Sequence, residues 1–335
     1  MNDIYFKKDY ARLYEKIEGG AAEEFCYEGP EGTVKNLFIK REIPLEVEGG
    51  PYYDLTTPYG YGGPIILDCK NGDRDGLAKA YEAAFQRYCN ENNVVCEFVR
   101  FHPLFNNAAD FKECYEIRFK RKTIQTWLKG WDDLILHEYS SSCRRDIRQS
   151  LRAGVEFQVV QNPDDLHDFK KIYYSTMNRN DADSIYYFDD EYFENCMKLL
   201  GEYLVTVEVM YEGKTIGMSI SFACGDAIHA HLTGTLKEYH RLAPAYVLQY
   251  ALALWGEEHG YERIHHGGGR TGEKDDKLYQ FKKKFSKSAE LDYFTGHRIW
   301  NPEVYGLLCE KAGTEMSGDI LPAYRLAAKT EKTMS

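Results

Sequence analysis

The sequence predicts an α+β protein built from two domains, and two observations support this. The chain has 335 residues, and because a typical domain takes roughly 100–200 residues, that length is enough for two. The second half switches between helical and strand periodicity in the order helix, helix, three antiparallel strands, long helix, strand, helix, strand. One long helix that crosses between strands is typical of an α+β domain. The first half repeats this order less clearly.

The second half contains the clearer elements. A serine run at 140–142 suits the N-cap of a basic helix over 140–153. Three later strands are separated by turns that contain glycine, and a strongly apolar helix follows them. The remaining spacing predicts helices at 163–176, 189–200, 244–260 and 278–285, and strands at 203–213, 214–225, 227–237, 262–268 and 289–295.

The first half shows the same two periodicities. Apolar side chains recur at helical spacing between Leu77 and Tyr88. Alternating or β-rich runs predict strands on both sides of that helix. The predicted helices are 8–18 and 75–92, and the predicted strands are 33–43, 51–56, 94–101 and 117–127.

Composition excludes several classes of protein. The net charge is −11, which argues against non-specific DNA binding. The charge is uneven: residues 118–152 hold nine basic and four acidic residues, or +5, and residues 270–287 hold seven and three, or +4. These windows are either solvated faces or places where a few side chains meet ligand phosphates.

The cysteines and the hydropathy set further expectations. Nine cysteines, with no Cys-x-x-Cys pair, indicate reduced thiols and neither a disulfide framework nor a zinc site. The first ten residues have no apolar core typical of a signal peptide, and no apolar run approaches the roughly 18 residues that span a bilayer. We therefore expect a soluble, cytoplasmic protein with no metal and no membrane span.

One motif joins the end of a strand to the start of a helix. Pro244 stands in the first-turn position, where its missing N–H costs nothing, and a helix N-terminus attracts anions. An ordinary strand-to-helix connection is the competing interpretation. The residues that we expect to bind a ligand at this connection are Gly234, Thr235, Arg241, Leu242, Ala243, Pro244 and Ala245.

A second motif is the glycine-rich run at 265–274. Its spacing is close to that of a phosphate-binding P-loop, but Glu273 stands where the lysine belongs, which excludes a nucleotide triphosphatase of that type. The run is either a plain strand exit or a backbone that approaches a ligand. Downstream, Phe281 and Phe285 lie four apart and face one side of a helix. One of the three lysines between them could stabilise developing negative charge.

Two other groups of residues are candidates with strong structural alternatives. Tyr52, Asp54, Tyr59 and Tyr61 would make a polar, aromatic wall for an acceptor, although the segment also suits a hairpin-like loop. Four histidines lie on two predicted strands, and any of them could act as a general base. A structural role is favoured for each, and no third ligand is spaced for a metal. They are His229, His231, His265 and His266.

Four segments together make the chain similar to the FemABX family, the tandem-GNAT aminoacyltransferases of peptidoglycan bridge formation, and to their acetyltransferase-like relatives. The most specific piece is the glycine-rich strand followed by Leu-x-x-Phe-Lys-x-x-Phe. The usual GNAT donor loop reads Arg/Gln-x-x-Gly-x-Gly/Ala; here Arg241-x-x-Pro244 keeps the basic residue and loses the glycines. The segments are 52–64, 140–157, 231–261 and 264–286.

The resemblance implies two GNAT-like domains with the acceptor in a cleft between them. Residues 1–138 with 300–335 would form the acceptor side, and residues 139–299 the donor side. It also implies that Lys282, after Phe281, stabilises the transition state of acyl transfer. In that fold, two central strands separate to admit the donor, whose pyrophosphate lies on the next helix. The resemblance therefore implies that the ligand-binding residues between Gly234 and Ala245 bind an acyl donor.

The expected function is transfer of an acyl or aminoacyl group from acyl-CoA or aminoacyl-tRNA to an amine. The acceptor would be a small molecule or a cell-wall or polysaccharide precursor, as in bacterial peptidoglycan biogenesis. No tightly bound cofactor is expected, and tRNA is a possible partner. The alternative is a GNAT-like module that binds a ligand without catalysis.

Overall fold

The computed structural model describes residues 2–316 and 322–325, which form two compact units. Of the described residues, unit 1 holds Tyr5–Lys120, Asp292–Met316 and 322–325, and unit 2 holds Asn2–Ile4 and Arg121–Leu291. The sequence placed the boundaries at 138/139 and 299/300. In the structure the chain passes from one compact unit to the other at 120/121, inside β6 (Glu116–Trp127), and at 291/292, inside β12 (Ala289–Ile299).

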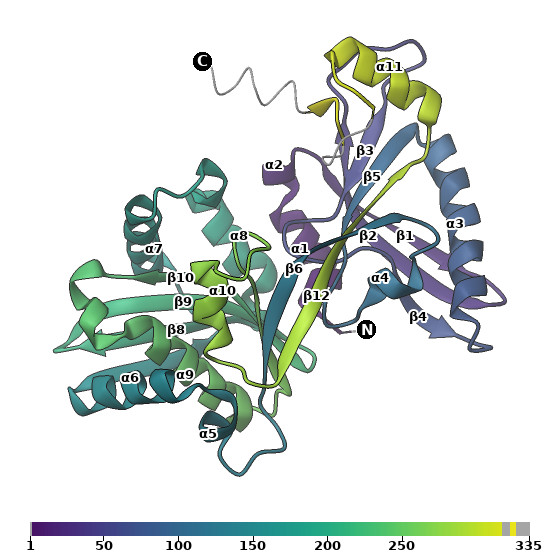
Figure 1. Ribbon diagram of the computed structural model, residues 1–335. Helices are drawn as coiled ribbons and strands as arrows, with labels where there is room; N and C mark the ends of the chain where they lie inside the picture. Colours follow the sequence, from purple (N-terminus) through teal and green to yellow (C-terminus); the bar gives the residue numbers. More distant parts are fainter. Residues whose placement is uncertain (1, 317–321, 326–335) are drawn as a thin grey trace. The chain divides into compact units, whose positions relative to one another are not determined.

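Unit 1 is a mixed sheet with helices on both faces. Its strands follow the order β1-β2-β3-β5-β12, and β4 pairs with β2. In Figure 1, α3 lies along one face of this sheet and α1 and α2 lie against the other. The other strands are β1 (Ala21–Glu28), β2 (Gly32–Glu42), β3 (Tyr53–Thr56), β4 (Ile65–Cys69) and β5 (Val94–Arg100); the helices are η1 (Ile4–Phe6), α1 (Lys8–Leu13), α2 (Glu15–Glu18), α3 (Arg74–Glu91), α4 (Asn107–Asp110) and α11 (Pro302–Ala312).

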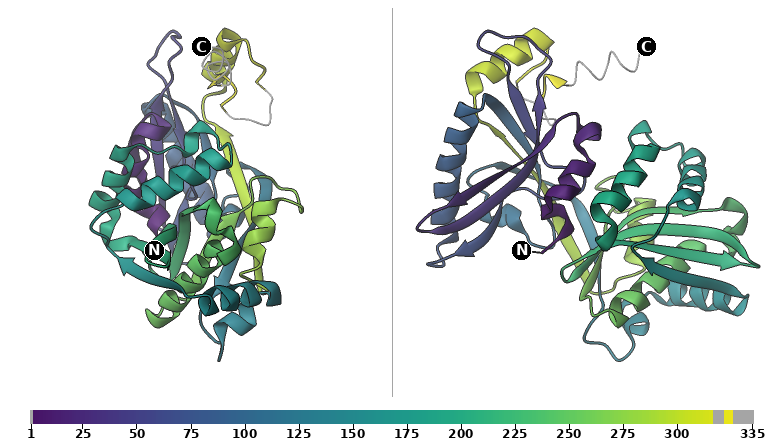
Figure 2. Two further views of the ribbon diagram at one scale, coloured as in Figure 1. Left: turned by 90° about the vertical axis from the view of Figure 1, so that its left-hand side faces the viewer. Right: turned by 180° about the vertical axis from the view of Figure 1, so that it is seen from behind.

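Unit 2 has a sheet of order β6-β11-β10-β9-β8-β7. Figure 2 shows α6 and α9 against one face of it and α7 and α8 against the other. Its remaining strands are β7 (Val155–Gln161), β8 (Leu204–Tyr211), β9 (Lys214–Cys224), β10 (Ala227–Thr235) and β11 (Arg263–Gly268); its helices are α5 (Leu134–Glu138), α6 (Ser141–Arg152), α7 (His167–Arg179), η2 (Ser184–Tyr186), α8 (Asp190–Leu200), η3 (Gly201–Tyr203), η4 (Lys237–Leu242), α9 (Pro244–Glu258) and α10 (Lys277–Lys283).

The order of elements in unit 2 positions the site. β8, β9 and β10 form an antiparallel meander, and α9 then crosses over so that β11 pairs in parallel with β10. Such a crossover needs a dozen or more residues, which α9 and its connections supply. The predicted N-cap of the basic helix is confirmed, because the Ser140 hydroxyl accepts the Cys143 N–H at 3.3 Å.

No helix within residues 2–316 and 322–325 is both long enough and apolar enough to cross a bilayer.

The core of unit 1 contains one buried carboxyl group. Glu97 on β5 is 1% exposed. Its two oxygens accept hydrogen bonds from the Asn36 amide and the Tyr115 hydroxyl, both at 2.8 Å. Burial raises the pKa of Glu97 to about 7, although these hydrogen bonds oppose the shift. Folding therefore takes up a proton at this position between pH 4.5 and 7.

This shift predicts a pH-dependent effect of Glu97→Gln. Because the folded pKa is raised, stability associated with Glu97 is present below about pH 4.5 and is lost as the pH rises through about 7. Glu97→Gln removes that loss, so its free energy of unfolding should improve relative to wild type by roughly 3 kcal/mol between pH 4.5 and 8. Urea unfolding at several pH values measures this. Glu91→Gln, on the exposed end of α3, is the control and should show no such trend.

Candidate functional site

The central feature of unit 2 is that two parallel strands separate. β10 and β11 are paired at only three positions, Ala227↔Arg263, Ile228↔Ile264 and His229↔His265. β10 then continues to Thr235 and β11 to Gly268, but within the described residues the two strands form no further pairs. Each strand also carries an irregularity just past this point, between Ala230 and Leu232 and between His265 and Gly267. Bulges bend strands and redirect their edges, so the two strands diverge.

The end of β10 is covered closely by α7. A Cβ on Gly234 would lie 2.6 Å from the backbone nitrogen of Tyr173, so only glycine fits there. The Thr235 N–H donates to the Thr176 hydroxyl at 2.8 Å, and the Thr235 carbonyl accepts from Arg179 at 2.8 Å. The structure thus gives both predicted donor residues a packing role, and the Thr235 N–H is already engaged.

The loop between β10 and α9 is built differently from a glycine-rich phosphate loop. η4 occupies most of it, and the Leu242 carbonyl accepts the Ser150 hydroxyl of α6 at 2.6 Å. Ala243 adopts a left-handed conformation, with φ 45° and ψ 46°, and is the N-cap of α9. Arg241 is exposed. The loop is therefore a packed turn.

Few backbone donors remain at the start of α9. A helix N-terminus ordinarily offers several unpaired N–H groups to an anion. Here the Ala243 N–H bonds the His240 carbonyl and the Tyr246 N–H bonds the Ala243 carbonyl, both at 3.0 Å. Pro244 has no N–H. Of the first-turn donors, this leaves the Ala245 N–H for a ligand.

Two cations meet the carbonyls at the end of β11. The Lys282 ammonium donates to the Gly268 carbonyl at 2.8 Å. Arg121 donates to the carbonyls of Gly269 and Arg270. Burial, together with the nearby positive charge of Arg121, lowers the pKa of Lys282 to about 8. A lysine has three donors, so the ammonium can still bind an incoming oxygen.

The loop after β11 is organised by one carboxylate. Asp276 accepts the N–H groups of Arg270 and Thr271, each at 2.8 Å, and caps α10 through the Tyr279 N–H at 2.9 Å. Burial alone would raise the pKa of Asp276, but these hydrogen bonds lower it to about 2. Asp276 was not among the predicted site residues. The sequence signal that could have revealed it is an aspartate directly before a helix, where Asp is a favoured N-cap.

Phe281 connects α10 to α9. Its ring centroid lies 5.3 Å from that of Tyr246 and 5.0 Å from that of Phe285. The Lys284 ammonium also donates to the Tyr246 hydroxyl at 2.7 Å. Phe285 is fully buried and Phe281 is half-buried, as their four-residue spacing predicted. These contacts place Lys282 on a helix that is held against the first turns of α9.

The histidines have structural partners. His231 contacts the Tyr192 hydroxyl at 2.7 Å, and burial lowers the pKa of His231 to about 3. Burial and the charge of Lys282 lower the pKa of His266 to about 3 as well. At such values neither imidazole is an effective base near neutral pH.

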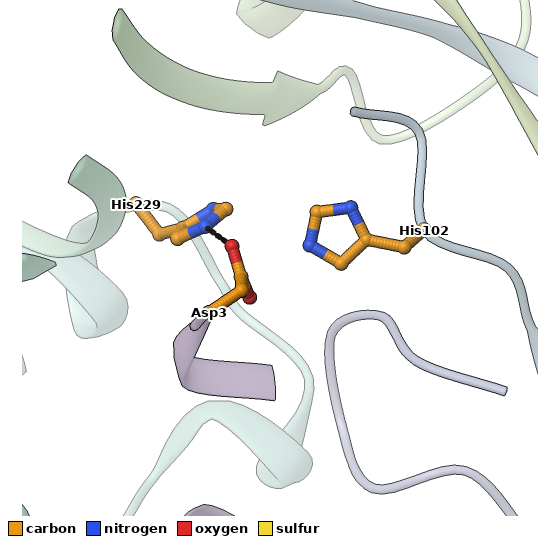
Figure 3. A group of neighbouring side chains, drawn as sticks. All are labelled: Asp3, His102 and His229. Carbon is orange, nitrogen blue, oxygen red and sulfur yellow. Dashed lines mark hydrogen bonds and ion pairs between the residues drawn. The ribbon is translucent and has the colours of Figure 1, made fainter. Parts of the chain in front are cut away.

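His229 forms a buried pair that the sequence did not reveal. Its Nε2 lies 2.8 Å from the Asp3 carboxylate, and both side chains are 1% exposed (Figure 3). Residues 3 and 229 are 226 positions apart, and no local pattern connects them. His265, on the neighbouring strand, contacts the Thr123 hydroxyl at 3.0 Å.

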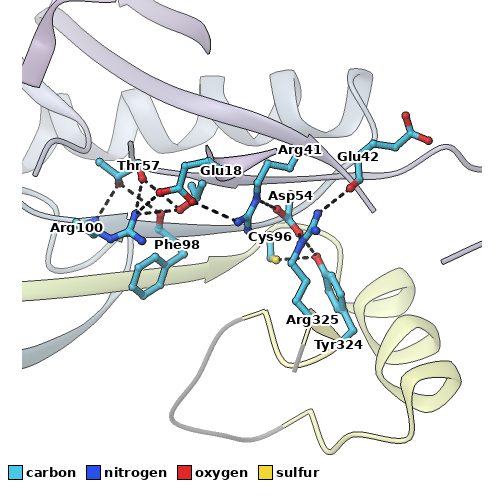
Figure 4. A network of polar contacts seen from close by, with 11 residues as sticks. Glu18, Arg41, Glu42, Asp54, Thr57, Cys96, Phe98, Arg100, Tyr324 and Arg325 are labelled. Atoms are coloured by element: carbon cyan, nitrogen blue, oxygen red, sulfur yellow. Dashed lines mark hydrogen bonds and ion pairs between the residues drawn. The ribbon is translucent and has the colours of Figure 1, made fainter. Parts of the chain in front are cut away.

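Asp54, a predicted acceptor residue in unit 1, is fully buried. Its carboxylate accepts from Arg41 at 2.6 Å, from the Tyr324 hydroxyl at 3.0 Å, and from Arg325 (Figure 4). It thus joins β2, β3 and residues 322–325. We therefore leave Asp54 out of the acceptor site proposed below.

The three predicted acceptor tyrosines do not form one wall. Tyr52 packs against a cluster that contains Tyr305 of α11. Tyr61 belongs to a different cluster, where its ring centroid lies 5.2 Å from that of Tyr293. Tyr59 stacks on Tyr14 at 5.6 Å. The acceptor role of these residues stays a prediction.

Comparisons with known proteins agree with this geometry. Residues 138–282 match the family described as the acetyltransferase (GNAT) domain. Over 172 residues, or 51% of this chain, it is 27% identical to the UDP-N-acetylmuramoylpentapeptide-lysine N(6)-alanyltransferase of Weissella viridescens. The aligned part is 50% of that protein, so the chain spans about half the length of the curated relative it matches.

Two solved structures share the fold along nearly the whole chain. A crystal structure of FemX has a TM-score of 0.69 and 15% identity, covering 91% of this chain and 94% of that one. The C-terminal domain of a putative lysylphosphatidylglycerol synthetase from Agrobacterium fabrum has a TM-score of 0.55 and 13% identity, covering 96% and 94%. At these identities the likeness concerns the fold.

Residues 138–282, which make up most of unit 2, thus match the GNAT domain family. Along 91% of its length the chain shares the fold of FemX. The predicted α+β, GNAT-like fold is confirmed, and so is the predicted resemblance to FemX-like GNAT proteins. The roles of the individual site residues stay predictions.

The contact between β10 and α7 predicts the effect of Gly234→Ala. The new methyl group would meet backbone atoms of Tyr173 and Ile172 at 2.6–2.8 Å, and backbone cannot rotate away. We expect a loss of about 2 kcal/mol in the free energy of unfolding, measured in urea. Gly306→Ala, inside α11, is the control, because its methyl would meet only the Met316 side chain, at 3.4 Å. Equal stability of the two variants would contradict the close packing.

Proposed function

We propose that the protein transfers an aminoacyl group from an activated ester to the amine of a cell-wall precursor. The observation that carries this proposal is the separation of β10 and β11 beyond His229 and His265, with the Lys282 ammonium at the end of β11. This arrangement leaves the end of β10 without a strand partner on the β11 side, beside a cation. Acyl transfer needs both features: a place for the acyl group and positive charge for the oxygen that becomes negative.

In the proposed reaction, the acceptor amine attacks the carbonyl carbon of the donor ester. The carbonyl oxygen becomes an oxyanion, and the Lys282 ammonium donates a hydrogen bond to it. The C–O bond to the leaving group then breaks, and the proton lost by the amine ends on the released hydroxyl. Phe281 holds the lysine in position through its contacts with Tyr246 and Phe285.

The start of α9 supports an ester of tRNA over a CoA thioester as the donor. A CoA pyrophosphate in this fold would lie against the helix N-terminus. Here Pro244 has no N–H, and the N–H groups of Ala243 and Tyr246 are used within the protein. The exposed arginines Arg145 and Arg148 of α6 offer positive charge to an RNA backbone in spite of the net charge of −11.

The relative from Weissella viridescens supports the choice of acceptor, because its name specifies a lysine of UDP-N-acetylmuramoylpentapeptide. We propose a lysine side chain of a similar nucleotide-linked precursor as the acceptor, which would place the reaction in the cytoplasm. Tyr59 and Tyr61, which lie in unit 1, are the proposed acceptor contacts.

The donor proposal predicts the outcome of a calorimetric titration. Coenzyme A should give no saturable heat up to ~1 mM, whereas alanyl-tRNA should bind with a micromolar Kd. Uncharged tRNA serves as the control for the aminoacyl group. Micromolar binding of coenzyme A would contradict the choice of donor while leaving acyl transfer possible. Binding of neither ligand would contradict the proposed function.

The role of Lys282 predicts a loss of turnover in Lys282→Ala. Removing a cation that stabilises the transition state should lower kcat roughly 100-fold, with little change in KM for either substrate. Lys283→Ala is the matched control: Lys283 is exposed and pairs with Glu290, so that variant should retain activity. The measurement is steady-state transfer of alanine from alanyl-tRNA to UDP-N-acetylmuramoylpentapeptide. Unchanged turnover in Lys282→Ala would remove the lysine from the mechanism.

The lowered pKa of Lys282 predicts a pH effect. Because that pKa is about 8, the ammonium is present below pH 8 and is lost as the pH rises through this value. Arginine keeps its charge at every such pH. The ratio of kcat in Lys282→Arg to kcat in wild type should therefore rise between pH 7 and 9. The ratio cancels the titration of the acceptor amine. A ratio that falls over this range would indicate that neutral Lys282 is the active form.

A further inference from the structure

The separation of β10 from β11 creates a problem for the backbone at the end of β10. In a continuous sheet, a neighbouring strand would bond the outward N–H and C=O groups. Thr235 has no strand partner on the β11 side within the described residues, and it is 7% exposed. A buried backbone group without a hydrogen bond costs free energy comparable to a lost bond. Something other than a strand must therefore bond Thr235.

The partners come from the last turn of α7. The Thr176 hydroxyl lies 2.8 Å from the Thr235 nitrogen, which donates to it, and 3.1 Å from the Thr235 carbonyl oxygen. The Arg179 guanidinium donates to the same carbonyl at 2.8 Å. Thr176 and Arg179 are three residues apart, so they lie on one face of the helix. Two side chains therefore replace the missing strand.

The approach of α7 requires a residue without a side chain on β10. Gly234 meets the α7 backbone at Ile172 and Tyr173. This close approach of α7 to β10 brings Thr176 within reach of Thr235. The contact also continues into the next loop, because the Thr235 hydroxyl lies 3.4 Å from Nε2 of His240 in η4.

We propose that Thr176 and Arg179 form a clamp that keeps β10 apart from β11 and thereby sets the opening that receives the donor. The two are positioning residues, because they act on the donor through Thr235 and the loop to α9. The effect of the clamp on donor binding rests on the proposed function. The hydrogen bonds of the clamp to the β10 backbone can be tested without measuring turnover.

The first test measures the clamp directly. In Thr176→Val the hydroxyl is lost at nearly constant volume, and in Arg179→Met the donor to the carbonyl is lost. Hydrogen exchange of peptides that cover 230–243 should become faster in both variants, by about tenfold for the loss of one hydrogen bond. Thr206→Val and Lys171→Met are matched controls. Thr206 is a buried threonine on β8, and Lys171 is an exposed cation on α7 whose partner is Asp168.

The second test measures the consequence for the donor. KM for alanyl-tRNA should rise about tenfold in Thr176→Val, with a smaller change in kcat, because the opening is displaced while Lys282 is retained. Thr176→Ser keeps the hydroxyl and Arg179→Lys keeps a donor, so both should restore KM toward the wild-type value. A general loss of stability would not raise KM more than it lowers kcat, and Thr176→Ser and Arg179→Lys would not then restore KM.

The outcomes separate the clamp from the proposed function. Unchanged exchange over 230–243 in both Thr176→Val and Arg179→Met would overturn the clamp. Faster exchange with unchanged KM for alanyl-tRNA would overturn its role in setting the opening. If the wild-type protein transfers no alanine, the proposed function fails, and the exchange experiment still decides whether the clamp exists.

Discussion

The structure of unit 2 depends on the need to satisfy backbone polar groups where two parallel strands part. β10 and β11 share only three registered positions, so the rest of each facing edge needs other partners. On β10 those partners are Thr176 and Arg179 of α7, at Thr235. On β11 they are the cations of Lys282 and Arg121, which bond the carbonyls of its glycine-rich end. The opening that we propose for the donor exists because the protein supplies these substitutes.

The same contacts determine the electrostatics of the site. Lys282 is held at the Gly268 carbonyl, half-buried and close to Arg121, and both burial and the like charge lower its pKa to about 8. Asp276 organises the adjoining loop with hydrogen bonds to its carboxylate, which keep it ionised. A lysine in such surroundings is less strongly hydrated than one on the surface, so its charge acts more strongly on a nearby oxygen.

Much of the fold and part of the site could be predicted from local patterns. The serine N-cap of α6, the proline that opens α9 and the Phe281–Phe285 spacing are short-range features, and each is present in the structure. The sequence did not reveal that Gly234 and Thr235 contact α7, because α7 lies about sixty residues earlier in the chain. For the same reason the sequence predicted a ligand-binding role for Asp54 and did not reveal its buried contacts with Arg41 and Tyr324.

The sequence by itself determined the order of helices and strands, the helix start at Pro244 and the shared face of Phe281 and Phe285, because periodicity, capping and residue spacing are local properties of the chain. Only the tertiary structure decided that β10 and β11 part after three pairs, that α7 bonds the freed end of β10, and that Asp3 meets His229 across 226 positions. These depend on which distant segments pack together, and that packing is set by the whole core rather than by any one stretch of residues.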